Sequence, residues 1–79
     1  MRLDTLPLNI PATITQIDWA MVSESAARRL KAFGFEGGAK VEALHFGGII
    51  AQDPIAFRIG RMTIALRRAQ AAAITVIPL

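Results

Sequence analysis

The hydrophobic positions of this chain follow a helical spacing in one stretch. Four of them are separated by four, four and three residues and fall on one stripe of a helix: Val22, Ala26, Leu30 and Phe33. Ser23 suits the N-cap of that helix. Gly34 can adopt the left-handed backbone that ends a helix, so that Phe35 folds back onto it. The pattern therefore predicts one substantial helix over Ser23–Phe33.

Elsewhere the chain is rich in β-forming residues, arranged in short stretches between turn residues. Five segments are expected to be strands: Ala12–Trp19, Lys40–Phe46, Ile55–Ile59, Met62–Leu66 and Ala73–Leu79. In the first, the alternation slips by one between Ile14 and Ile17, which predicts a β-bulge. The alanine-rich segment Arg67–Ala72 is expected to form one or two helical turns.

The strand expected over Lys40–Phe46 alternates in polarity. Strict alternation divides its residues between two faces, Val41, Ala43 and His45 on one and Glu42, Leu44 and Phe46 on the other. Leu44 and Phe46 are expected to face inward at its far end. In the strand expected over Ile55–Ile59, Phe57 and Ile59 share one side and Arg58 takes the other.

Closely spaced short strands in a small chain favour a closed or partly closed barrel, because closure removes exposed strand edges. The sequence has 79 residues, which is enough for one modest core. We therefore expect a mainly β fold with one substantial helix, forming a single domain over residues 1–79.

The composition is apolar, with 53% hydrophobic residues and a mean hydropathy of +0.43. No uncharged apolar run reaches the roughly 18 residues of a membrane span, and Arg2 and Asp4 are not followed by a signal-peptide core. A cytosolic location without membrane insertion is expected. The apolar excess indicates either a β-rich core or an exposed patch for a partner, and both can hold.

The net charge is +3, and the basic residues form two clusters. Such a charge favours binding to an acidic protein surface, a nucleic acid or an anionic membrane. The alternative is a solvated surface that binds no partner. The first cluster falls away from the apolar stripe of the predicted helix: Arg28, Arg29 and Lys31. The second is made of Arg58, Arg61, Arg67 and Arg68. Trp19 and Met21, in the connection before the helix, form either a lid on the barrel or part of a partner patch, with the lid favoured.

The sequence contains no recognisable set of catalytic residues. The chain has no cysteine, and Ser23 and Ser25 have no general base nearby in sequence. His45 is the single histidine; His45 and Asp53 are weak candidates for a divalent metal, and a structural histidine is favoured. We expect no enzyme and no cofactor.

Several motifs together resemble the FeoA family over most of the chain, from about Leu6 to Ile77. They are Arg29-Leu30 with Phe33-Gly34-Phe35 and Gly38, Val41, Asp53-Pro54, Gly60, Ile64-Ala65-Leu66-Arg67, and Ala71 with Ile74 and Val76. Glu36-Gly37-Gly38 departs from the proline-glycine turn more usual in that family. The resemblance implies a small SH3-like β-barrel with an inserted helix.

The same resemblance implies an accessory protein of bacterial ferrous-iron uptake, which docks on the cytosolic GTP-binding part of a FeoB-like permease. Arg28, Arg29, Lys31, Trp19 and Met21 are the candidate contacts. One alternative is a small basic barrel that binds nucleic acid. The five aromatic residues are mostly at core-like positions, which argues against this alternative because bases stack on exposed rings. A weaker one is a ligand-sensing domain detached from a regulator.

Overall fold

The computed structural model describes residues 1–48 and 52–79. The strands are β1 (Pro11–Ile17), β2 (Lys40–Phe46), β3 (Ile55–Ile59), β4 (Met62–Leu66) and β5 (Ile74–Pro78). The helices are α1 (Glu24–Ala32) and the short α2 (Arg68–Ala71), accompanied by the 3-10 turns η1 (Leu3–Thr5) and η2 (Trp19–Met21). The prediction of a mainly β fold with one substantial helix is confirmed. The loop expected between β2 and β3 includes residues 49–51, which lie outside the described residues.

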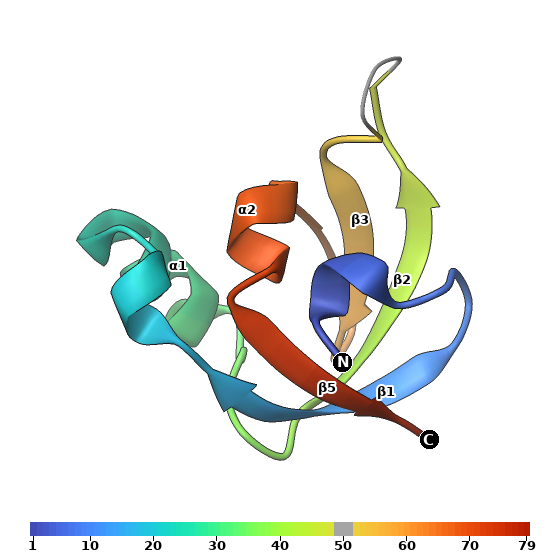
Figure 1. Cartoon of the computed structure of the whole chain (residues 1–79), viewed down its shortest axis with the longest axis horizontal. Coiled ribbons are helices and arrows are strands. Elements are labelled where there is room, and N and C mark those ends of the chain that lie inside the picture. The colour runs from blue at the N-terminus through green and yellow to red at the C-terminus, as the bar shows by residue number, and fades with distance from the viewer. Residues whose placement is uncertain (49–51) are drawn as a thin grey trace.

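The five strands form one antiparallel sheet in the order β4-β3-β2-β1-β5. The sheet is strongly curved, so that β1 and β5 cross the direction of β2 and β3 (Figure 1). The segment before β1 returns along β5, where the backbones of Met1 and Val76 exchange hydrogen bonds of 2.9 and 2.7 Å. In the part of the chain that the structure describes, no helix has the length and apolar character to cross a membrane.

The core lies inside this curved sheet and receives side chains from every strand. Its largest fully buried members are Phe35, Phe57, Leu3, Ile14, Leu30, Ile55, Ile74, Val41 and Val76. Along β3, Phe57 and Ile59 are buried and Arg58 is exposed, as the alternation predicts. Along β1, the pairing with β5 shifts between Ile14 and Gln16, which confirms the predicted bulge.

A second bulge, in β2, corrects the prediction made from strict alternation. The pairing with β3 shifts between Ala43 and His45, so that Ala43 lies opposite Phe57 whereas His45 lies opposite Ala56. The extra residue moves His45 off the face of Val41 and Ala43, on which strict alternation places it: those two residues are buried, whereas His45 is exposed. Phe46 packs against the core as predicted, but Leu44 does not: it stands at the bulge, half-buried and outside the core cluster.

Helix α1 begins and ends as its sequence predicts. The Ser23 hydroxyl accepts a hydrogen bond of 3.1 Å from the Ala26 amide, and Gly34 adopts a φ of +94° after the last turn. The Phe35 amide then donates to the Leu30 carbonyl at 3.0 Å, and the Gly34 amide donates to the Lys31 carbonyl at 3.1 Å. This pair of bonds is a Schellman motif. It turns the completely buried Phe35 ring into the core and fixes how α1 sits beside the sheet.

Candidate protein-interaction surface

The three basic side chains of α1 form one exposed surface, here called the α1 basic face: Arg28, Arg29 and Lys31. The opposite side of the helix buries Ala26 and Leu30. Arg28 lies 3.7 Å from Glu24 one turn earlier, in an ion pair whose two side chains are 71% and 90% exposed. An exposed pair of this kind contributes little to stability, so Arg28 is free to exchange Glu24 for an acidic group on a partner.

Lys31 and Trp19 are brought together by the fold. The Lys31 ammonium lies 4.8 Å from the centroid of the Trp19 ring, a cation–π contact between the last turn of α1 and η2. Trp19 is partly buried and packs against the core, as the lid interpretation predicts.

Met21 lies in the same 3-10 turn as Trp19 but is more exposed to solvent. It is 57% exposed. The turn is held by the Asp18 side chain, which accepts a hydrogen bond of 3.2 Å from the Ala20 amide. A large exposed apolar side chain, on a turn that contacts α1 through Trp19 and Lys31, suits a protein contact in which apolar burial and charge act together.

Three arginines of the second basic cluster contact other groups of the molecule. Arg58 lies 4.0 Å from Glu42 and Arg67 lies 3.9 Å from Asp53. The Arg68 guanidinium donates to the Asp4 carbonyl at 3.0 Å and ties α2 to η1. The Arg68 bond has a structural role, whereas the ion pairs of Arg58 and Arg67 are long, with largely exposed guanidinium groups, and contribute little to stability.

The structure places the two candidate metal ligands in different roles. His45 is exposed on the outer face of β2. The Asp53 carboxylate accepts a hydrogen bond of 3.0 Å from the Arg68 amide and faces Arg67. Within residues 1–48 and 52–79, no three His, Cys, Asp or Glu side chains are grouped so that they could hold a metal ion.

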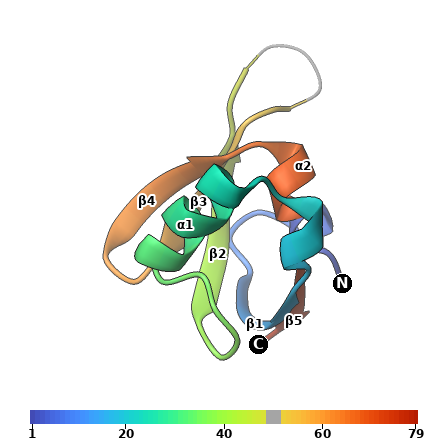
Figure 2. The ribbon, with the colours of Figure 1, turned by 90° about the vertical axis from the view of Figure 1, so that its left-hand side faces the viewer.

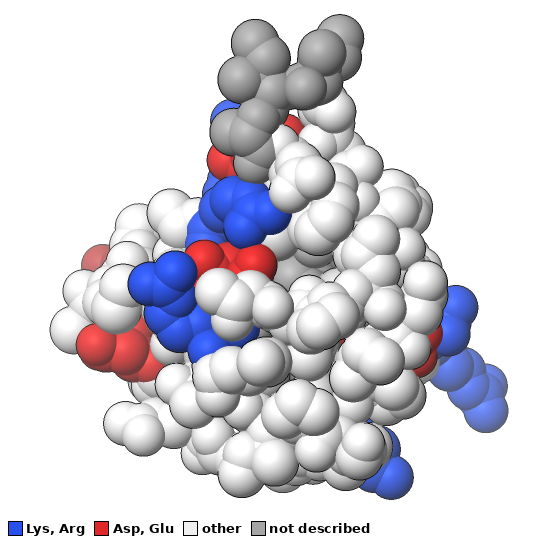
Figure 3. Space-filling view, turned by 45° about the vertical axis from the view of Figure 1, so that its right-hand side comes forward, with Lys and Arg blue, Asp and Glu red and all other residues white. Residues whose placement is uncertain are grey.

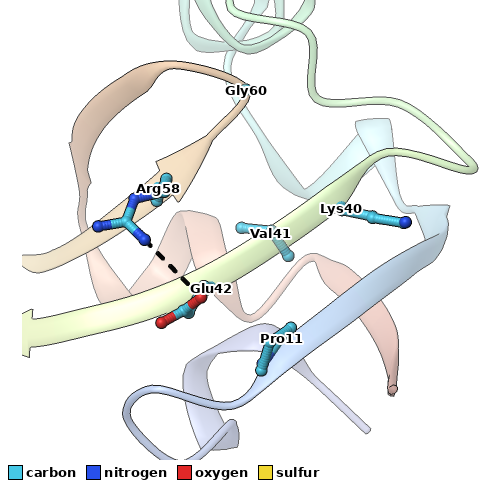
Figure 4. Close-up of a pocket in the computed structure, with 6 residues that line it drawn as sticks. All are labelled: Pro11, Lys40, Val41, Glu42, Arg58 and Gly60. Atoms are coloured by element: carbon cyan, nitrogen blue, oxygen red, sulfur yellow. Dashed lines mark ion pairs between the residues drawn. The ribbon is translucent and has the colours of Figure 1, made fainter.

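A shallow hollow that no sequence pattern indicates lies where β1, β2 and the β3–β4 turn meet. It has a volume of about 290 Å³ and is lined by Pro11, Lys40, Val41, Glu42, Arg58 and Gly60. Figure 4 shows the Arg58–Glu42 ion pair on one side of it, with Lys40 pointing away along β2. These residues are up to 49 positions apart and meet only through strand pairing, so no local pattern could reveal them.

Exposed apolar side chains are present in addition to the core, so the apolar excess is not confined to the core. Those near the termini are Met1, Ile10, Ile77 and Leu79, and Met21 and Met62 lie elsewhere. Figure 3 shows a broad uncharged area beside a group of side chains of both signs. By contrast, all five aromatic rings are in or against the core, so they offer nucleic-acid bases little surface for stacking: Trp19, Phe33, Phe35, Phe46 and Phe57.

Comparison with known proteins identifies the fold and the family. The FeoA domain model matches residues 1–78, while no curated protein matches the sequence. The FeoA protein of Chlorobium tepidum is 32% identical, with a TM-score of 0.85 over 100% of this chain and 70% of that one. A zinc complex of Stenotrophomonas maltophilia FeoA, described as a prokaryotic SH3 domain protein, is 28% identical, with a TM-score of 0.81 over 98% of this chain and 89% of that one.

The SH3-like fold expected from the sequence is confirmed by this likeness. A manganese-dependent transcriptional repressor shares the fold at 20% identity and a TM-score of 0.81, over 100% of this chain and 41% of the repressor. With a family model that matches nearly its whole length, the chain belongs to the FeoA family, which is associated with ferrous iron transport.

Proposed function

We propose that this chain is a cytosolic accessory protein of ferrous-iron uptake that docks on the GTP-binding domain of a FeoB-like membrane permease. Family membership supports the link to iron transport. The docking role is supported by one observation above all: the Lys31–Trp19 contact joins the α1 basic face to η2, the capped turn that also carries the exposed Met21.

The two parts of this surface have different roles in the proposed complex. Met21 supplies apolar area that is removed from water on binding. The arginines of the α1 basic face steer the chain toward an acidic surface and set its orientation. Lys31 is less available than Arg28 and Arg29, because it lies over the Trp19 ring.

Isothermal titration calorimetry of the chain against the isolated GTP-binding domain, with and without GTP, tests the proposal. Saturable binding supports the accessory role, and a difference between the nucleotide states indicates an effect on the GTP cycle. An Arg28→Glu/Arg29→Glu double variant is expected to lower the affinity by about tenfold or more, and the loss should shrink as salt is raised.

The matched control compares single charge reversals. Arg29→Glu lies on the α1 basic face, whereas Lys40→Glu makes the same change on β2. Arg29→Glu should weaken binding and Lys40→Glu should not. Equal effects would show that net charge alone is sensed, and no binding of the native chain in either nucleotide state would contradict the proposal.

A further inference from the structure

The outer side of β4 is a free strand edge. β4 is the last strand of the sheet and pairs with β3 alone. Figure 2 shows it as the outermost ribbon on its side of the molecule. Thr63 and Ala65 in the middle of this strand are exposed. We call this side of Met62–Leu66 the β4 edge.

The hairpin register determines which backbone groups point out of the β4 edge. β3 and β4 are joined by the two residues Gly60 and Arg61, and Ile59 lies opposite Met62. In a two-residue hairpin the closing pair exchanges hydrogen bonds, and every second pair after it does the same. Met62, Ile64 and Leu66 therefore bond to β3, whereas Thr63 and Ala65 direct their N–H and C=O groups outward.

Those four outward groups are available to another chain. Among the described residues, neither Thr63 nor Ala65 has a backbone hydrogen bond outside the strand ladder. The other end of the sheet is different, because the backbone of Val76 on β5 is already bonded to Met1. An added extended segment at the β4 edge would gain four main-chain hydrogen bonds, which is the mode called β-augmentation.

The positive charges at the two ends of the β4 edge favour a partner segment with negative charges at matching positions. The five residues Met62–Leu66 carry no charge, while Arg61 precedes them and Arg67 follows in extended conformation. Arg61 is exposed and has no ion pair within the described part of the chain. Arg67 is also largely exposed, with 68% of its side chain accessible beside Asp53. An incoming strand with carboxylates near both ends would face an arginine at each.

A second copy of this chain fits poorly at the same edge in the register that pairs all four outward groups of each copy. If two copies pair antiparallel so that Thr63 of each lies opposite Ala65 of the other, then Arg61 of each lies opposite Arg67 of the other. Like charges directly opposite across a strand pair are destabilising, and this register creates two such pairs. This repulsion disfavours self-association through a strand edge that is otherwise uncharged.

The geometry points to the β4 edge as a docking site for an extended segment of another protein, β-branched or apolar at its centre and with Asp or Glu on both sides. This inference does not depend on the permease proposal, because it concerns a different strand and a different kind of contact. The two surfaces can be separated by mutation.

NMR titration of the ¹⁵N-labelled chain with a defined peptide tests the inference. The probe is the acetylated, amidated peptide Glu-Thr-Val-Thr-Val-Thr-Glu, and its counterpart carries Lys at both ends. The acidic peptide should shift the amide signals of Thr63 and Ala65 and slow their hydrogen exchange. The Lys-ended peptide should bind about tenfold more weakly or not at all, since two attractive charge pairs become repulsive.

A variant pair isolates the main-chain hydrogen bonds. Ala65→Pro removes an N–H that points out of the β4 edge and leaves the β3 ladder intact, which an edge strand tolerates. Ala65→Thr changes the same position but keeps the N–H. Binding of the acidic peptide should be lost in A65P and retained in A65T, and the dispersed spectrum of each variant shows whether it is folded.

Several results would overturn the inference. They are equal binding of the two peptides, shifts that are absent from Thr63 and Ala65 at millimolar acidic peptide, and binding retained by a folded A65P. Protection of these two amides that grows with protein concentration alone would assign the edge to a second copy instead. The Arg28→Glu/Arg29→Glu variant should bind the peptide normally, so a failure of permease docking and a failure of peptide binding are distinguishable.

Discussion

Lys31 holds its ammonium 4.8 Å above the Trp19 ring and so joins the end of α1 to the 3-10 turn that precedes the helix. The contact links the α1 basic face to the partly buried lid of the core. It also divides the basic residues by role, because Lys31 is engaged with a ring whereas Arg29 is exposed and has no ion pair within the described residues.

Removing this contact should loosen the lid. Lys31→Ala is expected to lower the free energy of unfolding by about 0.5–1 kcal/mol, the usual size of an exposed cation–π contact. Urea unfolding followed by the fluorescence of Trp19, the single tryptophan, measures the loss. Arg29→Ala is the control and should change stability by less than about 0.5 kcal/mol. Equal losses in the two variants would mean that the ring contact contributes nothing specific.

The exposed Met21 of η2 should matter for binding and not for folding. Met21→Gln is expected to weaken binding to the permease GTP-binding domain by about tenfold, because a partly exposed apolar group is worth roughly 1–2 kcal/mol when it is buried in an interface. Calorimetric titration measures this change. Met62→Gln is the matched control, since Met62 is 41% exposed on β4. If Met62→Gln costs as much as Met21→Gln, the contact surface extends beyond η2.

The glycine that ends α1 should resist substitution for backbone reasons alone. A Cβ at Gly34 would meet no atom within 4 Å, but the residue has a φ of +94°. Gly34→Ala is therefore expected to cost about 1–2 kcal/mol of stability, the penalty for a left-handed conformation with a side chain.

Gly37→Ala gives the comparison in the same turn. Gly37 lacks a positive φ, and its added Cβ would make an ordinary contact of 3.8 Å with the Thr15 carbonyl oxygen. Chemical denaturation of both variants should show a loss in G34A alone. A stable G34A would mean that the turn can rearrange into another helix cap.

The carboxylate of Asp53 should act mainly as a cap for α2. It accepts a hydrogen bond from the Arg68 amide, at the first residue of that helix, and its ion pair with Arg67 is long and exposed. Asp53→Ala is expected to cost about 1–2 kcal/mol, whereas Asp53→Asn, which keeps an acceptor oxygen, should cost less than half as much. Thermal unfolding of both variants checks this order. Equal losses would assign the stabilisation to the charge of Asp53.

Local chemistry was sufficient to predict much of this fold. The apolar stripe, Ser23 and Gly34 predicted where α1 begins and ends, since capping depends on residues within one turn of each other. The alternation of β3 and the slip between Ile14 and Ile17 predicted inward positions and a bulge for a similar reason, because each is a property of a single strand. The FeoA motifs added the SH3-like arrangement of these elements.

What depends on pairing between distant segments could not be predicted in this way. The bulge that moves His45 to the outer face is defined by the register of β2 against β3. The alternation of polar and apolar residues within β2 does not indicate it. Asp53 looks like a candidate ligand in the sequence and becomes a cap only when β3 and α2 are placed together. The sequence by itself determined the elements and the inward positions of α1 and β3, because these follow from neighbours along the chain. The tertiary structure decided the partners of the polar groups and left the β4 edge open, because both depend on which strands lie side by side.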